Sequence, residues 1–181
     1  MARKKQSWVW RTIAKIAPKF FDQIVAYGKK RPYVNIIGDD GVPYMDRWWL
    51  MPKFLIGKDA KGDPYPYSWL PFVIRLHHIR RNDGDRALHD HPANYRTIIL
   101  RGGYVEETIY GELEQISAGE TDFNKAETFH RIDFVPPGGV WTIFIMGKRR
   151  NDWGFLTGGH KVGWKDYLES SNSTGKKHGK A

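Results

Sequence analysis

The stretch YRTIILRGGYVEETIY, residues 95–110, decides the fold. It consists of two apolar runs, Tyr95–Leu100 and Tyr104–Tyr110, on either side of Arg101-Gly102-Gly103. Apolar runs of this length that are separated by a glycine turn are typical of β-strands. The stretch therefore predicts two neighbouring strands joined by a short turn.

The same pattern continues in both directions from this stretch. Further apolar runs lie at Tyr33–Ile37, Tyr44–Leu50, Phe72–Ile79, His130–Val135, Trp141–Met146 and Trp153–Leu156. Turn residues separate them, as in Gly38-Asp39-Asp40-Gly41 and Pro136-Pro137-Gly138-Gly139. About eight short strands with no helix between them predict a mainly β protein, either an antiparallel sandwich or a barrel. A length of 181 residues fits one domain with appendages.

The first 31 residues have a helical period instead. Apolar side chains recur every three to five residues, at Trp8, Ile13, Ile16, Phe20, Ile24 and Tyr27. Pro18 is suited to begin a second helix, and Gly28 is suited to end it. We expect a basic helical arm over residues 1–31 that packs on the body of the domain. A basic amphipathic helix on a membrane surface is the alternative.

The net charge of +9 is carried by the two ends of the chain. Residues 1–31 hold nine Lys and Arg against one Asp, residues 170–181 hold three Lys and no acid, and residues 32–169 hold 17 basic against 19 acidic residues. Charge on the ends does not make a shaped binding face, so no specific nucleic-acid partner is expected. Residues 170–181 lack an apolar anchor and are predicted to be a disordered tail. A short final helix is expected over residues 164–169.

The composition also excludes several kinds of site. No cysteine occurs, which rules out disulfides, thiolate metal ligands and cysteine nucleophiles. The apolar run Val140–Met146 is far shorter than the roughly 20 residues that cross a bilayer. The basic start is interrupted by Arg11, Lys15 and Pro18, so it lacks the apolar block of a signal peptide. We expect a cytoplasmic protein with no membrane partner.

Two histidines have the spacing of metal ligands. In a strand, residues i and i+2 project from one face roughly 7 Å apart, so His89 and His91 can converge on one ion while Asp90 points away. With seven His in the chain, such a pair arises by chance in roughly a quarter of sequences, so the motif needs context. Gly84 and Gly102 flank the pair, and His130 lies 39 residues after His91 at the start of a predicted strand.

With these flanking residues the chain resembles the cupin superfamily. Gly84-(x4)-His89-Asp90-His91-(x3)-Tyr95-(x6)-Gly102 follows the first cupin motif with one residue missing, and Ala126-Glu127-Thr128-Phe129-His130 stands in the place of the second. More narrowly, Leu88-His89-Asp90-His91-Pro92 is similar to small phage and bacterial cupins. The likeness covers about residues 44–168 and implies a single jelly-roll β-barrel over residues 32–169. It also implies a divalent metal held by His89, His91 and His130.

The chain departs from the family at two places. The metal-binding glutamate of the family falls on Tyr95, and the second motif lacks its Pro and Gly and has Phe134 where Asn is usual. Glu106 or Glu107 is a candidate fourth ligand, although strand alternation lets only one of them face inwards. Three neutral imidazoles with open positions suit Fe(II), which we favour, and also Zn(II), Mn(II), Ni(II) or Cu(II).

Other residues have both a functional and a structural interpretation. Tyr95 is a candidate catalytic phenol or a core aromatic. Arg96 is a candidate for holding an anionic substrate, as are Arg75 and Arg101, although strand arginines commonly face solvent. His77 and His78 must face opposite ways, and a structural role is expected for them. The three motif histidines themselves can be ordinary surface or hydrogen-bonded residues.

The function that the resemblance implies is a metal-binding cupin acting on a small molecule. A non-haem Fe(II)-dependent oxygenase or dioxygenase is the first choice, because three-His cupins include thiol dioxygenases. Those enzymes often use a Cys cross-linked to Tyr, which this chain cannot form. Two alternatives stay open, a metal-dependent isomerase, epimerase or lyase, and a non-catalytic binding or structural module such as a phage component. A homodimer is compatible with each.

Overall fold

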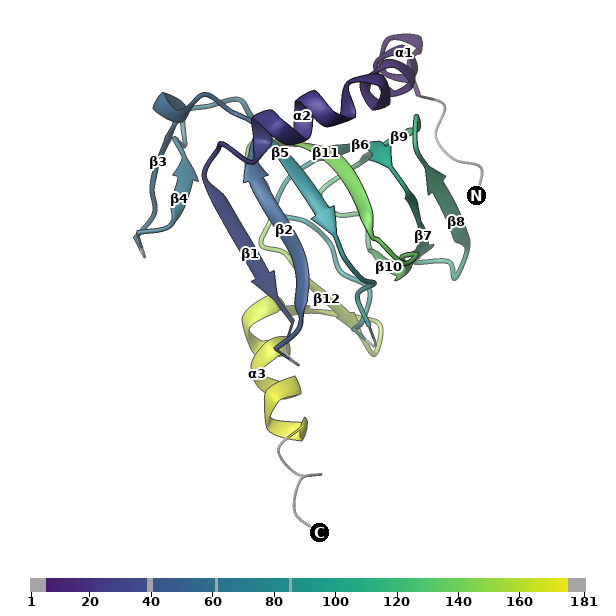
Figure 1. Cartoon of the computed structure of the whole chain (residues 1–181). Helices are drawn as coiled ribbons and strands as arrows, with labels where there is room; N and C mark the ends of the chain where they lie inside the picture. Colours follow the sequence, from purple (N-terminus) through teal and green to yellow (C-terminus); the bar gives the residue numbers. More distant parts are fainter. Residues whose placement is uncertain (1–5, 39–40, 61, 85, 176–181) are drawn as a thin grey trace.

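The computed structural model describes residues 6–38, 41–60, 62–84 and 86–175. This part of the chain is mainly β, with helices at both ends (Figure 1). The helical segments are α1 (Trp8–Ile16), η1 (Ala17–Phe20), α2 (Phe21–Gly28), η2 (Lys53–Leu55) and α3 (Trp164–Gly175). The strands are β1 (Tyr33–Ile37), β2 (Pro43–Trp49), β3 (Ile56–Lys58), β4 (Pro64–Pro66), β5 (Phe72–Ile79), β6 (Tyr95–Arg101), β7 (Gly103–Thr108), β8 (Leu113–Ser117), β9 (Thr121–Asn124), β10 (His130–Phe134), β11 (Val140–Gly147), β12 (Gly154–Thr157) and β13 (His160–Gly163).

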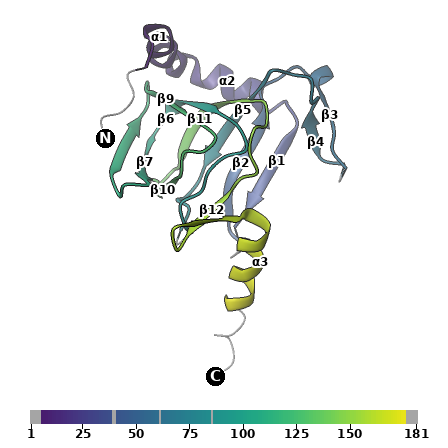
Figure 2. The same cartoon turned by 180° about the vertical axis from the view of Figure 1, so that it is seen from behind.

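Two antiparallel layers make up the body of the protein. One is a six-stranded sheet in the order β1-β2-β5-β11-β6-β9, and the other contains the sheets β10-β7-β8 and β12-β13 (Figures 1 and 2). Strands that are distant in sequence lie side by side, as expected for the predicted antiparallel sandwich or barrel. The prediction of a closed barrel is not confirmed, because no sheet in the described part of the chain closes on itself.

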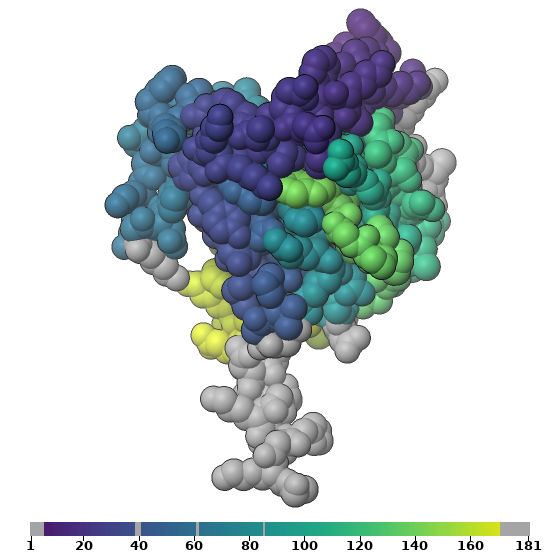
Figure 3. Space-filling model, viewed as in Figure 1, coloured from purple at the N-terminus to yellow at the C-terminus, as the bar shows by residue number. Residues whose placement is uncertain are grey.

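The two faces of the six-stranded sheet have different partners because side chains alternate along each strand. On the outer face, Leu76 of β5 and Leu100 of β6 are buried against Phe21 of α2. Figure 3 shows the helical arm lying across this sheet. On the inner face lie Tyr95 of β6 and Phe144 of β11, which stack with ring centroids 4.9 Å apart. The inner face looks towards the second layer.

The helical arm packs on the domain, but through a different stripe from the predicted one. Ala14, Phe21 and Gly28 are buried, whereas most of the predicted stripe is exposed, namely Trp8, Ile13, Ile16, Phe20 and Tyr27. The Phe21 ring meets Trp141 edge to face at 5.7 Å, and the guanidinium of Arg101 lies 3.5 Å above the centroid of Phe21. A Cβ atom on Gly28, the last residue of α2, would lie 2.6 Å from Leu76 Cδ2, so the glycine allows close approach to the sheet. None of the helices in the described ranges is long and apolar enough to span a bilayer.

The two strands predicted on either side of Arg101-Gly102-Gly103 form as β6 and β7, but they belong to different sheets and do not pair with each other. Gly102 has a φ of 79°, and a Cβ atom there would lie 2.8 Å from the carbonyl oxygen of Gly139. Any larger residue would meet both a strained backbone and a steric clash. This glycine therefore sets the turn that sends the chain from the six-stranded sheet into the second layer.

Two sequence expectations need correction. Helix α3 continues to Gly175, so the prediction of a disordered tail from residue 170 is wrong for residues 170–175, while residues 176–181 lie outside the described ranges. The helix starts against the body, where Tyr167 stacks on Phe155 at 3.9 Å. Strands β3, β4, β8, β9 and β13 were not predicted, because each has at most five residues and few consecutive apolar ones.

Replacing Phe21 by alanine tests the packing of the arm. Phe21 is 8% exposed, so Phe21→Ala removes a ring from a packed interface and is expected to lower the free energy of unfolding by about 3–5 kcal/mol. The matched control is Phe20→Ala, because Phe20 is 53% exposed and should change stability by less than about 0.5 kcal/mol. Urea unfolding measures both. Equal stability of the two variants would contradict the packing described.

Candidate metal centre

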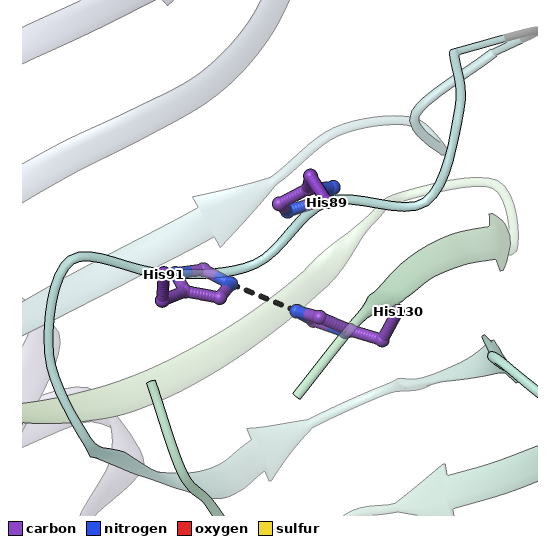
Figure 4. A group of neighbouring side chains, drawn as sticks. All are labelled: His89, His91 and His130. Atoms are coloured by element: carbon purple, nitrogen blue, oxygen red, sulfur yellow. Dashed lines mark hydrogen bonds between the residues drawn. The ribbon is translucent and has the colours of Figure 1, made fainter. Parts of the chain in front are cut away.

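Three histidines lie together at one end of the space between the two layers. His89, His91 and His130 each offer one ring nitrogen, and these nitrogens lie within 4.8 Å of one another (Figure 4). Nε2 of His91 is 2.8 Å from Nε2 of His130. One of these nitrogens therefore carries a proton, and the other accepts a hydrogen bond from it. This cluster unites all three metal ligands that the sequence predicted, and its donor set suits a divalent ion.

His89 and His91 were predicted to lie on one strand, but the backbone positions them in another way. His89 and His91 do not belong to a regular strand. His89 instead forms isolated bridges to His130 at the start of β10 and to Phe155 of β12. Its N–H donates to the His130 carbonyl at 2.8 Å, and the His130 N–H donates back at 3.0 Å. The His89 segment thereby joins the β10-β7-β8 sheet to β12-β13, and local extended geometry preserves the i, i+2 convergence.

Asp90 lies between the two histidines and points away from them, as predicted. Its carboxylate is 1% exposed, and it accepts hydrogen bonds from the Gly154 backbone at 2.7 Å, from Asn151 Nδ2 at 2.6 Å and from Lys161 Nζ at 2.5 Å. A buried carboxylate is tolerated when it is paired and hydrogen-bonded in this way. Asp90 therefore anchors the histidine segment to β12 and β13 and is outside the cluster.

Carboxylates contact the far side of two of the rings. Glu106 Oε1 lies 2.9 Å from His130 Nδ1, on the opposite side of that ring from Nε2. The contact is an ion-pair contact, because His130 Nδ1 has no partner with good hydrogen-bond geometry in the described part of the chain. Asp83 Oδ2 lies 3.9 Å from His89 Nδ1 and accepts a hydrogen bond from the Ile132 N–H at 2.6 Å. Such outer carboxylates orient ligand imidazoles in metal sites.

The fourth-ligand prediction is corrected by this arrangement. As alternation required, only one of the two glutamates faces inwards: Glu106 is 6% exposed, whereas Glu107 pairs with Arg131 Nε at 2.6 Å. Glu106, however, contacts the ring nitrogen that faces away from the cluster and does not belong to the group of converging donors. Glu106 instead contacts His130 on the side of the ring opposite the cluster. Asp83 was missed because Arg81-Asn82-Asp83-Gly84 was interpreted only as a turn.

Burial lowers the pKa of all three histidines, and nearby negative charges reverse the shift at one of them. Burial, with the nearby charge of His130, lowers the pKa of His89 to about 4. The same causes lower the pKa of His91 well below its ordinary value. Burial also opposes charge on His130, but the negative charge of Glu106, 2.9 Å from Nδ1, together with the charges of Asp83 and Asp122, outweighs burial and raises the pKa of His130. Two of the three imidazoles are therefore neutral at neutral pH, as metal ligands must be.

Tyr95 stands beside the cluster, at the place of the family's glutamate. Its hydroxyl is 2.9 Å from His130 Nε2, and its side chain is 3% exposed. Burial, followed by the charge of Glu106, raises the pKa of Tyr95 well above its ordinary value, so the phenol stays protonated. A buried, protonated phenol at this position can donate a hydrogen bond to a group bound at the histidines.

The arginines occupy other places. Arg96 alternates with Tyr95 and faces the helical arm, where it donates to Gln6 Oε1 at 2.7 Å and lies over the Trp10 ring at 4.5 Å. The structure thus does not bring Arg96 to the histidines, and its assignment as a site residue is withdrawn. Arg101 also contacts the arm. Arg75 is on the inner face of β5, and His77 on the same face stacks on Phe144 at 4.9 Å.

A cavity of about 450 Å³ opens next to His130. Its walls include Glu106, Asp122 and Glu127 as well as the aromatic rings of Tyr110, Phe123 and Phe129. This volume falls within the range of small-molecule sites, which is about 300–1,000 Å³. Through His130, the histidine cluster therefore adjoins a space that a small molecule can enter.

Comparison with known proteins extends only to the fold. No protein-family model and no curated protein matches the chain. The structure of the DMSP lyase DddQ from Ruegeria pomeroyi is similar with a TM-score of 0.52 at 11% identity, over 86% of this chain and 80% of that one. A cupin 2 conserved barrel domain protein from Rhodopseudomonas palustris has a TM-score of 0.46 at 15% identity, over 77% and 83% of the two chains. A cupin-2 domain protein from Rhodospirillum rubrum has a TM-score of 0.47 at 10% identity, over 79% and 84%. At 11% identity, the likeness to the DddQ structure shows a shared fold and no more.

Replacing Glu106 by glutamine tests the support behind His130. Glu106→Gln removes the charge that orients His130, and we expect the affinity for Zn(II) to fall by about 10–100-fold, as is usual when an outer carboxylate of a metal site is lost. Glu107→Gln is the matched control, since Glu107 faces Arg131 on the other side of the same strand. Competition with a chromophoric chelator measures both affinities. Equal affinities in the two variants would show that Glu106 has no such role.

The dependence of metal affinity on pH tests the protonation of the cluster. His130 has a raised pKa, so a proton competes with the metal there already near neutral pH, whereas His89 stays neutral down to about pH 4. The affinity for Zn(II) is therefore expected to fall by about tenfold per pH unit between about pH 6.5 and 4.5, the slope of a single proton. Titrations over this range measure the slope. A fall in Zn(II) affinity of a hundredfold to a thousandfold per pH unit would mean that more than one imidazole takes up a proton in this range.

Proposed function

We propose that this chain is a metal-dependent enzyme that acts on a small molecule, with His89, His91 and His130 as the ligands of one divalent ion. The observation that carries the proposal is the convergence of three imidazole nitrogens within 4.8 Å, one of them on His130, which lines a cavity of about 450 Å³. A purely structural histidine cluster has no need of adjacent space. The supporting carboxylates and the lowered pKa values of His89 and His91 agree with a ligand role.

The first candidate activity is that of an Fe(II)-dependent oxygenase. The three imidazoles would hold the ion once His130 has lost its proton, and imidazole suits Fe(II) as well as Zn(II). When bound, the ion would supply a redox centre. The chain itself would position the substrate in the cavity beside His130. Tyr95 would hold a polar group of the substrate through a hydrogen bond from its hydroxyl.

A second candidate is a lyase or isomerase in which the ion acts as a Lewis acid. Tyr95 is placed to assist such a reaction, because a protonated phenol 2.9 Å from His130 Nε2 can donate a hydrogen bond to a substrate atom near the cluster. The DMSP lyase that shares this fold is named for such a non-redox reaction. For this chain, the two candidates differ in their need for oxygen.

Metal content tests the ligand set. The unaltered protein is expected to bind about one divalent ion per chain, and His91→Ala or His130→Ala should lose most of it while remaining folded, since the sheets do not depend on the metal as a zinc finger does. His160→Ala is the control, because His160 is exposed on β13. Elemental analysis after reconstitution with Fe(II) or Zn(II) measures the loss. Full metal in both cluster variants would overturn the proposal.

Oxygen consumption separates the two candidate activities. Protein loaded with Fe(II) under nitrogen is mixed with a panel of small carboxylic acids, and oxygen uptake and product formation are followed. An oxygenase consumes oxygen in proportion to product and is inactive when loaded with Zn(II). Turnover without oxygen, and with either metal, would replace the oxygenase by the lyase or isomerase.

A further inference from the structure

The helical arm has an apolar face that no other described segment covers. The arm meets the domain through the buried residues Ala14 and Phe21, and through Trp10, whose ring lies 4.5 Å below the guanidinium of Arg96. Other large apolar side chains of the arm are exposed, namely Trp8, Val9, Ile13, Ile16 and Phe20. In Figure 3 the arm lies at the surface of the molecule. The arm therefore carries two apolar faces, and the domain occupies one of them.

The exposed residues of α1 form one continuous stripe. An α-helix turns by about 100° per residue, so the four exposed apolar residues of α1 occupy an arc of about 140°. Ala14, which is fully buried against the domain, lies about 100° beyond the edge of this arc. An apolar arc of more than about 100° is the width that a helix normally buries against a partner. Phe20 continues the exposed stripe into η1.

Basic residues border the exposed stripe. Arg11 and Lys15 are exposed on α1, one helical turn apart and on the side of Trp8, and Lys19 is exposed in η1. None of these three cations forms an ion pair within the described ranges. Residues 1–31 contain nine Lys and Arg against one acid, Asp22. The partner that complements this segment is therefore both anionic and apolar.

We propose that the arm docks on an anionic lipid bilayer. The exposed stripe enters the interface between headgroups and acyl chains, and the basic residues face the acidic headgroups, as in other basic amphipathic helices that lie on membranes. Trp8 suits this depth, because its ring is apolar and its N–H is polar. With nine residues, α1 is about 14 Å long, less than half of a hydrocarbon core of about 30 Å, so it lies in the plane of the surface.

Two other occupants fit the arm less well. A second copy of the chain would bring together two arms with nine basic residues each, and like charges repel. A nucleic acid would match the charge, but its phosphates are contacted by basic and polar groups and leave a stripe of aliphatic side chains unused. The expectation of no membrane partner assumed that the predicted stripe faces the domain, whereas most of that stripe is exposed. Membrane docking does not rest on the proposed function.

Co-sedimentation with vesicles tests the docking. The full-length protein is mixed with sucrose-loaded vesicles of phosphatidylcholine containing about 30% phosphatidylserine, and with vesicles of phosphatidylcholine alone. We expect binding to the acidic vesicles at about 0.15 M NaCl, and binding to the neutral ones at least about tenfold weaker, since several cations lie near the surface. Raising the salt to about 0.5 M should weaken the binding, because the charges are then screened over a shorter distance.

Matched variants locate the membrane contact. Phe20 and Phe134 are both 53% exposed, but Phe134 is at the end of β10 in the second layer. Phe20→Ala and Trp8→Ala should each weaken binding to the acidic vesicles by about tenfold, because one inserted ring is lost, whereas Phe134→Ala should bind like the unaltered protein. Lys15→Gln should weaken it by about fivefold, and Lys58→Gln, which removes the same charge from β3, should not. Circular dichroism verifies the fold of each variant.

Several results would contradict membrane docking. One is an unaltered protein that does not bind the acidic vesicles, and another is equal binding by Trp8→Ala, Phe20→Ala and Phe134→Ala. A dimer detected by light scattering and dissociated by Phe20→Ala would show that a second copy covers the stripe. Tighter binding to a single-stranded oligonucleotide than to the vesicles, equal in Phe20→Ala and Phe134→Ala, would assign the arm to nucleic acid.

Discussion

The backbone bridge between His89 and His130 is the constraint on which both the fold and the site depend. Two reciprocal hydrogen bonds, of 2.8 and 3.0 Å, join an irregular segment to the first residue of β10. They connect the two small sheets of the second layer, and they bring the side chains of the same residues to one place. A change that shifts this register would separate the imidazoles and the sheets together.

Burial around this bridge determines the chemistry that the site can perform. The imidazoles of His89 and His91 stay neutral because their charged forms are poorly solvated. At His130 the charge of Glu106 favours the charged imidazole and raises its pKa. Asp90 carries the negative charge of the segment, and it is directed towards Lys161 and the backbone of Gly154. The protein thus keeps a strongly bound carboxylate outside the cluster and leaves three nitrogens and one phenol inside it.

The sequence predicted those parts of the fold and site that rest on local patterns. Apolar runs predicted strands β1 and β5, and a helix stop predicted the end of α2 at Gly28. Strand alternation predicted that only one of Glu106 and Glu107 faces inwards, without saying which. The convergence of the three histidines was predicted from motif resemblance. Arg96 was misplaced because a face of a strand cannot be assigned to the interior or the arm without knowing what covers it. Asp83 was missed because its importance depends on its contact with His89, which only the folded chain reveals.

The central claim is that His89, His91 and His130 coordinate one metal ion. X-ray absorption spectroscopy of the Zn(II)-loaded protein tests it most directly, because imidazole ligands give a characteristic multiple-scattering pattern. The account predicts three imidazole nitrogens at about 2.0–2.1 Å from the ion, and two in a His130→Ala protein that is loaded at high metal concentration. A spectrum with oxygen ligands only, or one that is the same in both proteins, would contradict it.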